Sequence, residues 1–196
     1  SVKKERVNKM RLNKKGMGVG QVFVFIIAAL TFALIMIFGY QSISRFIASG
    51  EDVAFVQFKT DLEGSIKTIY TEFGAVRIEK FYPPEKFEHI CFVNMNYDFT
   101  VEEKQALCKE NPLACDVLEE AQAGVAEGRC FTGYDCVEKN VFFKPQSTVP
   151  IKVYQISISD SEGEEEFGFL CKKIIQGLFS LGLEGKGDHT ELFNVG

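Results

Sequence analysis

Apolar residues fill one continuous stretch near the start of the chain. Between Lys15 and Arg45 no charged residue occurs, and the residues from Val19 to Tyr40 are mostly apolar. A helix of about 20 such residues, rising about 1.5 Å per residue, matches the roughly 30 Å hydrocarbon core of a bilayer. The stretch is apolar on all sides, and a chain of 196 residues has too little core to surround it. The pattern therefore predicts a membrane-spanning helix at about residues 19–40.

The apolar pattern continues after Tyr40, but with a different period. From Ile43 to Phe73 the apolar residues recur mostly every three or four positions, and polar residues fill most positions between them. This spacing is typical of a helix with one apolar face. The first proline is Pro83. We therefore expect one long helix over residues 17–73, whose amphipathic half, residues 43–73, packs on a head domain.

Short apolar runs after residue 75 predict a head domain, residues 75–196, with several strands. The runs alternate with polar residues or end at proline, glycine and acidic turns, as strands do. We expect strands within residues 76–81, 87–95, 130–143 and 151–159, with residues 167–175 as the hairpin partner of the last. Residues 180–195 are rich in glycine and fit edge strands and a tail.

Two short helices are expected between the second and third of these strands. Thr100 and Glu103 have the spacing of a capping box, which starts a helix to about residue 109. Asn111 and Pro112 fit the start of another helix, which Gly128 ends. The fold class is therefore α+β, with a long N-terminal helix, membrane-spanning and then amphipathic, followed by a β-rich head.

The charge distribution divides the chain at the apolar stretch. Residues 1–45 hold eight basic side chains and one acidic one, whereas the remaining 151 residues hold 14 basic and 26 acidic side chains. Basic residues next to a membrane helix stay on the cytoplasmic side. Seven of the eight precede the helix, so we expect a cytoplasmic segment at residues 1–16 and an extracellular head. The acidic head argues against nucleic acid as a partner.

The cysteines agree with this orientation, because all six follow the apolar stretch: Cys91, Cys108, Cys115, Cys130, Cys136 and Cys171. An even number of cysteines in an extracytoplasmic domain indicates disulfides. No CxxC motif occurs and the chain has two histidines, so we expect no metal site. Among the 15 pairings that six cysteines allow, we expect Cys130–Cys136 across a local turn, Cys108–Cys115 between neighbouring helical segments, and Cys91–Cys171 between two distant parts of the chain. Free buried thiols are the alternative.

The sequence carries none of the common motifs for catalysis. The chain has no nucleophile elbow, no zinc-protease motif and no phosphate-binding glycine loop before a soluble helix. The acidic residues from Asp160 to Glu166 lack the glycine pattern of a calcium loop and fit a solvated turn. We therefore expect no enzyme activity and no cofactor.

The residues around the start of the apolar stretch resemble a known family. Lys14, Lys15 and Gly16, followed by Met17, Gln21 and the apolar run, resemble the class III signal peptide of archaeal type IV pilin-like proteins, in the archaellin and pilin superfamily. In that family a membrane peptidase cuts after the glycine that follows basic residues. The resemblance implies cleavage between Gly16 and Met17, with Gln21 as the fifth mature residue, where many bacterial pilins carry glutamate.

This resemblance implies a structural role. The mature chain would be a subunit of an archaeal surface filament, would self-associate through its N-terminal helix, and would depend on a prepilin-type peptidase and on the assembly machinery in the membrane. The alternative is an uncleaved single-pass membrane protein whose acidic ectodomain acts as a binding or accessory subunit. Removal of the leader distinguishes the two hypotheses.

Overall fold

The computed structural model describes residues 19–160, 163 and 165–195, without the side chains of Val19, Gln21 and residues 43–51. The chain forms two compact units, Ser1–Ser49 and Gly50–Gly196, which are described separately. Helix α1 (Val19–Tyr70) has 52 residues and supplies the described part of the first unit and the start of the second. The second unit is the head.

Helix α1 ends at Tyr70, three residues before the expected end. The amide of Glu72 donates to the carbonyl of Ile69 at 2.9 Å, and Gly74 takes a positive φ of 75°. Gly185 of a neighbouring strand lies directly against the carbonyls of Ile69 and Glu72, where any Cβ would collide with them. The chain therefore turns at this point, because the sheet closes over the end of the helix.

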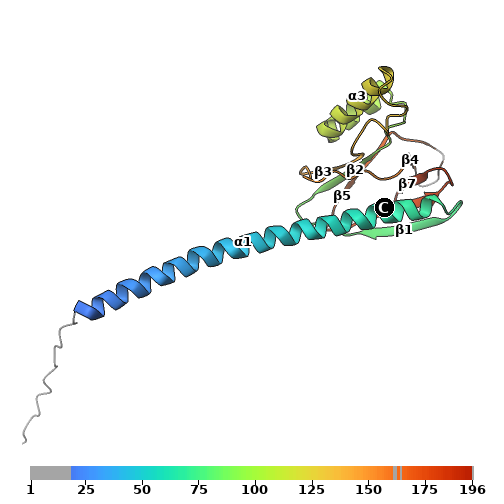
Figure 1. The fold of residues 1–196 in the computed structure, drawn as a ribbon. Coiled ribbons are helices and arrows are strands. Elements are labelled where there is room, and N and C mark those ends of the chain that lie inside the picture. The colour runs from blue at the N-terminus through green and yellow to red at the C-terminus, as the bar shows by residue number, and fades with distance from the viewer. Residues whose placement is uncertain (1–18, 161–162, 164, 196) are drawn as a thin grey trace, which may run out of the picture. The chain divides into compact units, whose positions relative to one another are not determined.

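Seven strands form two sheets in the described part of the chain (Figure 1). The four-stranded sheet has the order β1 (Val76–Phe81), β6 (Phe179–Gly185), β7 (Thr190–Asn194), β4 (Ile156–Ser159). The three-stranded sheet has the order β3 (Val141–Lys144), β2 (His89–Val93), β5 (Phe169–Lys173). Neighbouring strands are antiparallel, except that β4 and β7 are parallel.

The main core lies between the two sheets and α1. The helix supplies side chains spaced three or four residues apart, all at most 4% exposed: Phe55, Phe58, Leu62, Ile66 and Ile69. The rings of Phe55 and Phe143 meet edge to face, with their centroids 5.6 Å apart. The amphipathic part of α1 is therefore an integral part of the head core, as its sequence pattern predicts.

A second core covers the other face of the three-stranded sheet. Along β2, Ile90 and Phe92 point into the main core, whereas Cys91 and Val93 point into the second core, because side chains alternate along a strand. Helices α2 (Val101–Glu110) and α3 (Pro112–Ala126) lie on this second face (Figure 1). The three-stranded sheet is thus buried on both faces.

The ends of α2 and α3 confirm the expected capping. The Thr100 hydroxyl accepts from the Glu103 amide at 3.2 Å, and the Glu103 carboxylate accepts from the Thr100 amide at 3.0 Å. Asn111 caps α3 by accepting from the Ala114 amide at 3.1 Å. Gly128 follows α3 with a positive φ of 72°. The sequence could predict both helix N-caps because each depends on residues three positions apart.

The expected strand over residues 151–159 is wrong in its first half, because β4 contains only Ile156–Ser159. The buried side chain of Asn140 takes the place of a neighbouring strand at Val153. Its amide donates to the Val153 carbonyl at 3.1 Å, and its carbonyl oxygen accepts from the Val153 amide at 2.8 Å. The backbone of Val153 is therefore satisfied without a ladder partner.

Replacing Asn140 with alanine is expected to lower the free energy of unfolding by about 2–3 kcal/mol, because it leaves the buried N–H and C=O of Val153 without partners. Thermal unfolding of the full chain in non-ionic detergent measures this loss. Asn194, an exposed asparagine on β7, provides the matched control, and its alanine variant should unfold like the parent. Equal stability of the Asn140 variant and the parent would contradict the bridging role.

The hairpin expected between residues 151–159 and 167–175 is also wrong. Strand β5 pairs with β2 in the other sheet. Between the two expected hairpin strands, the described residues form an isolated β-bridge, Ser159 with Glu166. Gly168 packs against the rings of Phe99 and Tyr97, so the chain crosses from one sheet to the other at this residue. Hydrophobic alternation defined the strand but not its partner.

Residues 180–195 form two interior strands rather than edge strands and a tail. Leu181, Leu183 and Leu192 are fully buried in the main core. Gly182 lies under the ring of Phe193, where a Cβ would collide with the ring. The glycines therefore permit close packing in the middle of the sheet.

Candidate assembly surface

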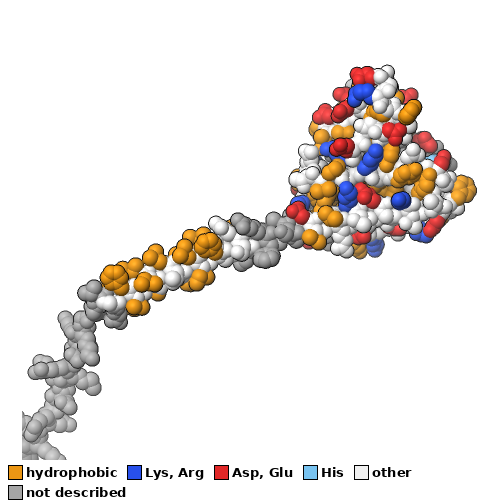
Figure 2. All heavy atoms as spheres, in the orientation of Figure 1, with side chains coloured by type: hydrophobic (Ala, Val, Ile, Leu, Met, Phe, Trp, Pro, Cys, Tyr) orange, Lys and Arg blue, Asp and Glu red, His pale blue; other side chains and the backbone are white. Residues whose placement is uncertain are grey.

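The described side chains from Val22 to Ser42 are all exposed within the structure. They include large apolar groups, with Phe25 and Phe38 each 62% exposed and Ile35 68% exposed. Figure 2 shows these hydrophobic side chains along the described part of the first unit. An apolar surface of this extent is typical of a site that contacts lipid or another protein.

The same segment, Val22–Ser42, is long and apolar enough to cross a membrane, and a signal sequence would have the same properties. Its backbone polar groups are bonded within the helix, as a lipid environment requires. The Thr31 hydroxyl also donates to the Ala28 carbonyl at 2.9 Å. The apolar side chains of this surface therefore offer packing contacts to whatever covers it.

The expected processing site lies outside the described residues: Lys14, Lys15, Gly16 and Met17. Gln21 lies within α1, but its side chain is outside the described part of the structure. The cleavage assignment therefore stays a prediction from the sequence.

The six cysteines lie in the three pairs that the sequence favoured. Cys91 and Cys171 are cross-strand neighbours on β2 and β5, with Cα atoms 4.0 Å apart. Cys108 and Cys115 join α2 to α3, with Cα atoms 4.9 Å apart. Cys130 and Cys136 close a loop after α3, with Cα atoms 5.6 Å apart. All three pairs are at disulfide-bonding distance.

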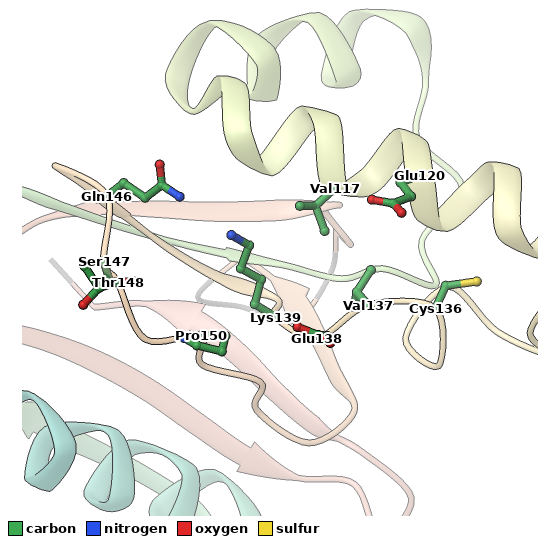
Figure 3. A pocket seen from close by; sticks show the side chains of 10 residues that line it. All are labelled: Val117, Glu120, Cys136, Val137, Glu138, Lys139, Gln146, Ser147, Thr148 and Pro150. Carbon is green, nitrogen blue, oxygen red and sulfur yellow. The ribbon is translucent and has the colours of Figure 1, made fainter.

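A polar cavity of about 570 Å³ lies between α3 and the loops on either side of β3. Figure 3 shows Lys139 extending between Gln146 and Val117, with Glu120 and Glu138 nearby. The Lys139 ammonium group lies 5.8 Å from the ring centre of Phe142. The Ser147 hydroxyl donates to the Val149 carbonyl at 3.1 Å, so it is not aligned with a base. The described lining of this cavity does not assemble a nucleophile with its base.

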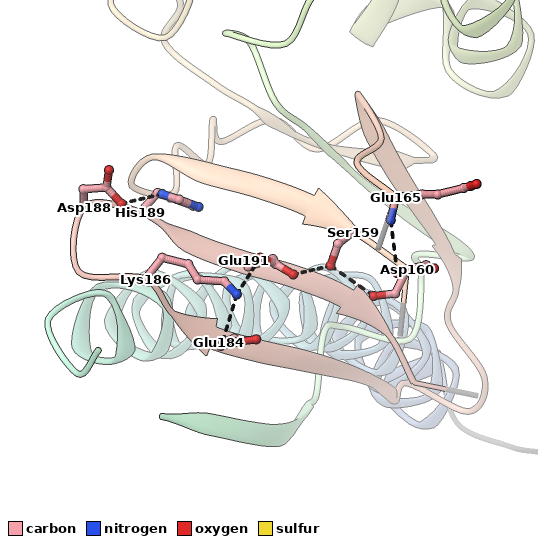
Figure 4. Close-up of polar contacts among 8 residues, drawn as sticks. All are labelled: Ser159, Asp160, Glu165, Glu184, Lys186, Asp188, His189 and Glu191. Atoms are coloured by element: carbon pink, nitrogen blue, oxygen red, sulfur yellow. Dashed lines mark hydrogen bonds and ion pairs between the residues drawn. The ribbon is translucent and has the colours of Figure 1, made fainter. Parts of the chain in front are cut away.

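A second polar group lies around β6 and β7 (Figure 4). Lys186 bridges Glu184 at 2.8 Å and Glu191 at 3.0 Å, and these carboxylates raise its pKa. The Ser159 hydroxyl donates to Glu191, which ties β4 to β7. Among the described residues, no three His, Cys, Asp or Glu side chains are placed to hold a metal ion. The group is consistent with surface ion pairing that supports the sheet.

Three further titratable groups have structural partners. The backbone hydrogen bond from Thr100 lowers the pKa of Glu103. Partial burial raises the pKa of Tyr97, whose hydroxyl lies 3.2 Å from the Glu103 carboxylate. Desolvation lowers the pKa of Lys172, which donates to the carbonyls of Ser180 at 2.6 Å and Val195 at 2.8 Å. Lys172 thereby connects the two sheets, a role with no local signal in the sequence.

The sequence identified the apolar segment as the candidate functional surface, and it missed the cavities of the head, whose linings come from distant parts of the chain. Lys139 and Gln146, for example, carry no motif and meet because β3 places both of its flanking loops beside α3. Comparison with protein-family models, with curated proteins and with solved structures finds no match for this chain.

Proposed function

We propose that this protein is a structural subunit of an archaeal surface filament of the type IV pilus kind, which assembles through its N-terminal helix. The proposal is carried by one observation, the exposed apolar surface from Val22 to Ser42 on a helix that also supplies the core of the head. In the proposed filament, neighbouring copies cover this surface. Burial of apolar area contributes roughly 25 cal/mol per Å², so a bundle of such helices would be a stable, permanent assembly.

The packing of α1 into the head supports this role. Leu62, Ile66 and Ile69 are fully buried under the sheets, so the end of the helix is part of the head core. A filament transmits force between its core and its outer domains. A helix that forms part of the domain core can transmit that force. In this proposal the leader up to Gly16 is removed, the head is extracellular, and the peptidase and assembly machinery lie in the membrane.

Leader processing tests the proposal. Intact mass and N-terminal sequence are measured on protein from membranes and on material sheared from cells. We expect a chain that starts at Met17 in the sheared fraction. Replacing Gly16 with phenylalanine should abolish this form, because the expected peptidase site requires a small residue there. Gly20→Ala is the matched control and should be processed normally, since a Cβ at Gly20 meets no atom within 4 Å.

The opposite result would support a different function. If the native protein keeps residues 1–16, occurs in membranes alone and ignores the Gly16 substitution, it is a single-pass membrane protein with a binding or accessory ectodomain. An exposed groove on the head beside α3 would then carry its main activity.

A further inference from the structure

A groove of about 810 Å³ lies on the head beside α3, away from the main core. Three parts of the chain form it: the segment before α2 together with the start of α2, the last turns of α3 and the loop that follows α3. Its apolar lining is formed by Met95, Phe99, Val101, Val125, Ala126 and Phe131. Val101 is 68% exposed and Phe131 is 96% exposed, so the apolar surface is open to solvent.

Phe131 is held on a fixed loop. The Cys130–Cys136 pair closes the loop, and the Tyr134 amide donates to the Asn96 side chain at 3.0 Å. Gly133 packs directly on the carbonyl of Met95, where a Cβ would collide. A solvent-exposed aromatic ring on a restrained loop loses little conformational entropy when it binds. Anchor residues of protein interfaces have this property.

The rim of the groove, formed by side chains in and next to its lining, is acidic. Asp98 lines the groove together with Lys104, the Tyr97 hydroxyl of the lining donates to Glu103 at 3.2 Å, and the Thr132 hydroxyl of the lining donates to Asp135 at 2.8 Å. Residues 95–104 and 122–135, which carry the lining, hold five acidic and two basic side chains in total. Both basic groups are already paired, Lys104 with Glu119 at 3.1 Å and Arg129 with Glu127 at 2.7 Å. Among the described residues, four carboxylates of the rim have no cationic partner: Asp98, Glu102, Glu103 and Asp135. A ligand that brings positive charge would complement this rim.

We propose that this groove binds a polypeptide segment in which a large apolar side chain is flanked by lysine or arginine. The apolar side chain packs between Phe131 and Val101, and the flanking cations interact with the rim carboxylates that have no cationic partner. A second head is disfavoured as the occupant, because residues 46–196 carry 14 basic and 26 acidic side chains, a net charge of −12. Anionic lipid headgroups and nucleic acids are disfavoured by the same repulsion. The inference holds for a filament subunit and for a single-pass membrane protein alike.

The test uses the full chain in non-ionic detergent and a blocked hexapeptide with a central Leu-Phe pair between two lysines on each side. Fluorescence anisotropy of the labelled peptide should show saturable binding that weakens with added salt. Replacing the lysines with glutamates should abolish it. Phe131→Ser should weaken binding at least about tenfold, as loss of an interface anchor does. Phe131→Ser should keep the fold, which circular dichroism checks, because the side chain is 96% exposed.

Phe73→Ser is the matched control, because Phe73 is another exposed phenylalanine, 83% exposed, that does not line the groove. It should bind the lysine peptide like the parent. Absence of saturable binding, equal binding of the glutamate peptide, or an unchanged affinity of Phe131→Ser would each overturn the proposal. Self-association of the chain that Phe131→Ser abolishes would also overturn it and would make a second copy the occupant. Retention of residues 1–16 would refute the filament and leave this result unaffected.

Discussion

Replacing Leu62 with alanine is expected to lower the free energy of unfolding of the head by about 3–5 kcal/mol. Leu62 is fully buried between α1 and the sheets, and its truncation removes apolar contacts and leaves a cavity. Urea unfolding of the full chain in non-ionic detergent measures the change. Tyrosine fluorescence follows the transition, because the chain has six tyrosines and no tryptophan.

Val56→Ala is the matched control for this experiment. Val56 lies on the same helix, but it is 51% exposed, so its truncation should change the free energy of unfolding by less than about 0.5 kcal/mol. Similar effects of the two substitutions would mean that α1 does not pack on the head as the structure has it. A loss confined to Leu62 would establish that the amphipathic half of the helix belongs to the folding unit of the head.

Removal of the Cys91–Cys171 pair by alanine at both positions is expected to destabilise the head by about 4–5 kcal/mol. The two residues are 80 positions apart, so the crosslink closes a long loop and strongly limits the unfolded chain. The expected observation is a large fall in the midpoint of thermal unfolding in non-reducing buffer. In excess reductant the parent and the variant should approach each other in stability.

The Cys108–Cys115 pair provides an internal comparison. Its cysteines are seven positions apart, and the loop-entropy relation gives a smaller loss of about 2–3 kcal/mol when both become alanine. The ratio between the two losses tests the pairing itself. If removing the short-range pair proved as costly as removing Cys91–Cys171, loop closure would not be the main contribution of these crosslinks.

Local features of this fold could be predicted because they depend on neighbouring residues. The capping box at Thr100 and the N-cap at Asn111 follow from contacts three residues apart, and strand β1 follows from alternation over residues 76–81. The favoured pairing of Cys108 with Cys115 rested on the same short range. The Cys91–Cys171 pair is nonlocal and joins two parts of the chain that lie 80 positions apart.

The features that could not be predicted depend on which strands meet. The sequence predicts strand β5 as the hairpin partner of β4, yet β5 pairs with β2. Its partly buried side chains Phe169 and Cys171 pack against the second core of the head. Asn140 lies within the expected strand region 130–143 and carries no sequence signal for its role, yet its side chain takes the place of a neighbouring strand at Val153. The groove around Phe131 needs three separate segments, so no single window of sequence contains it.

The sequence by itself determined the long helix, its apolar and amphipathic halves, the α+β composition of the head and the acidic charge of its surface. These properties follow from hydrophobic period and residue type, which act over a few helical turns or strand positions. Tertiary structure alone decided the strand order, the interior position of β6 and β7, and the groove that leaves Phe131 exposed. Those depend on which buried faces fit together, because packing joins residues whose separation in sequence carries no signal.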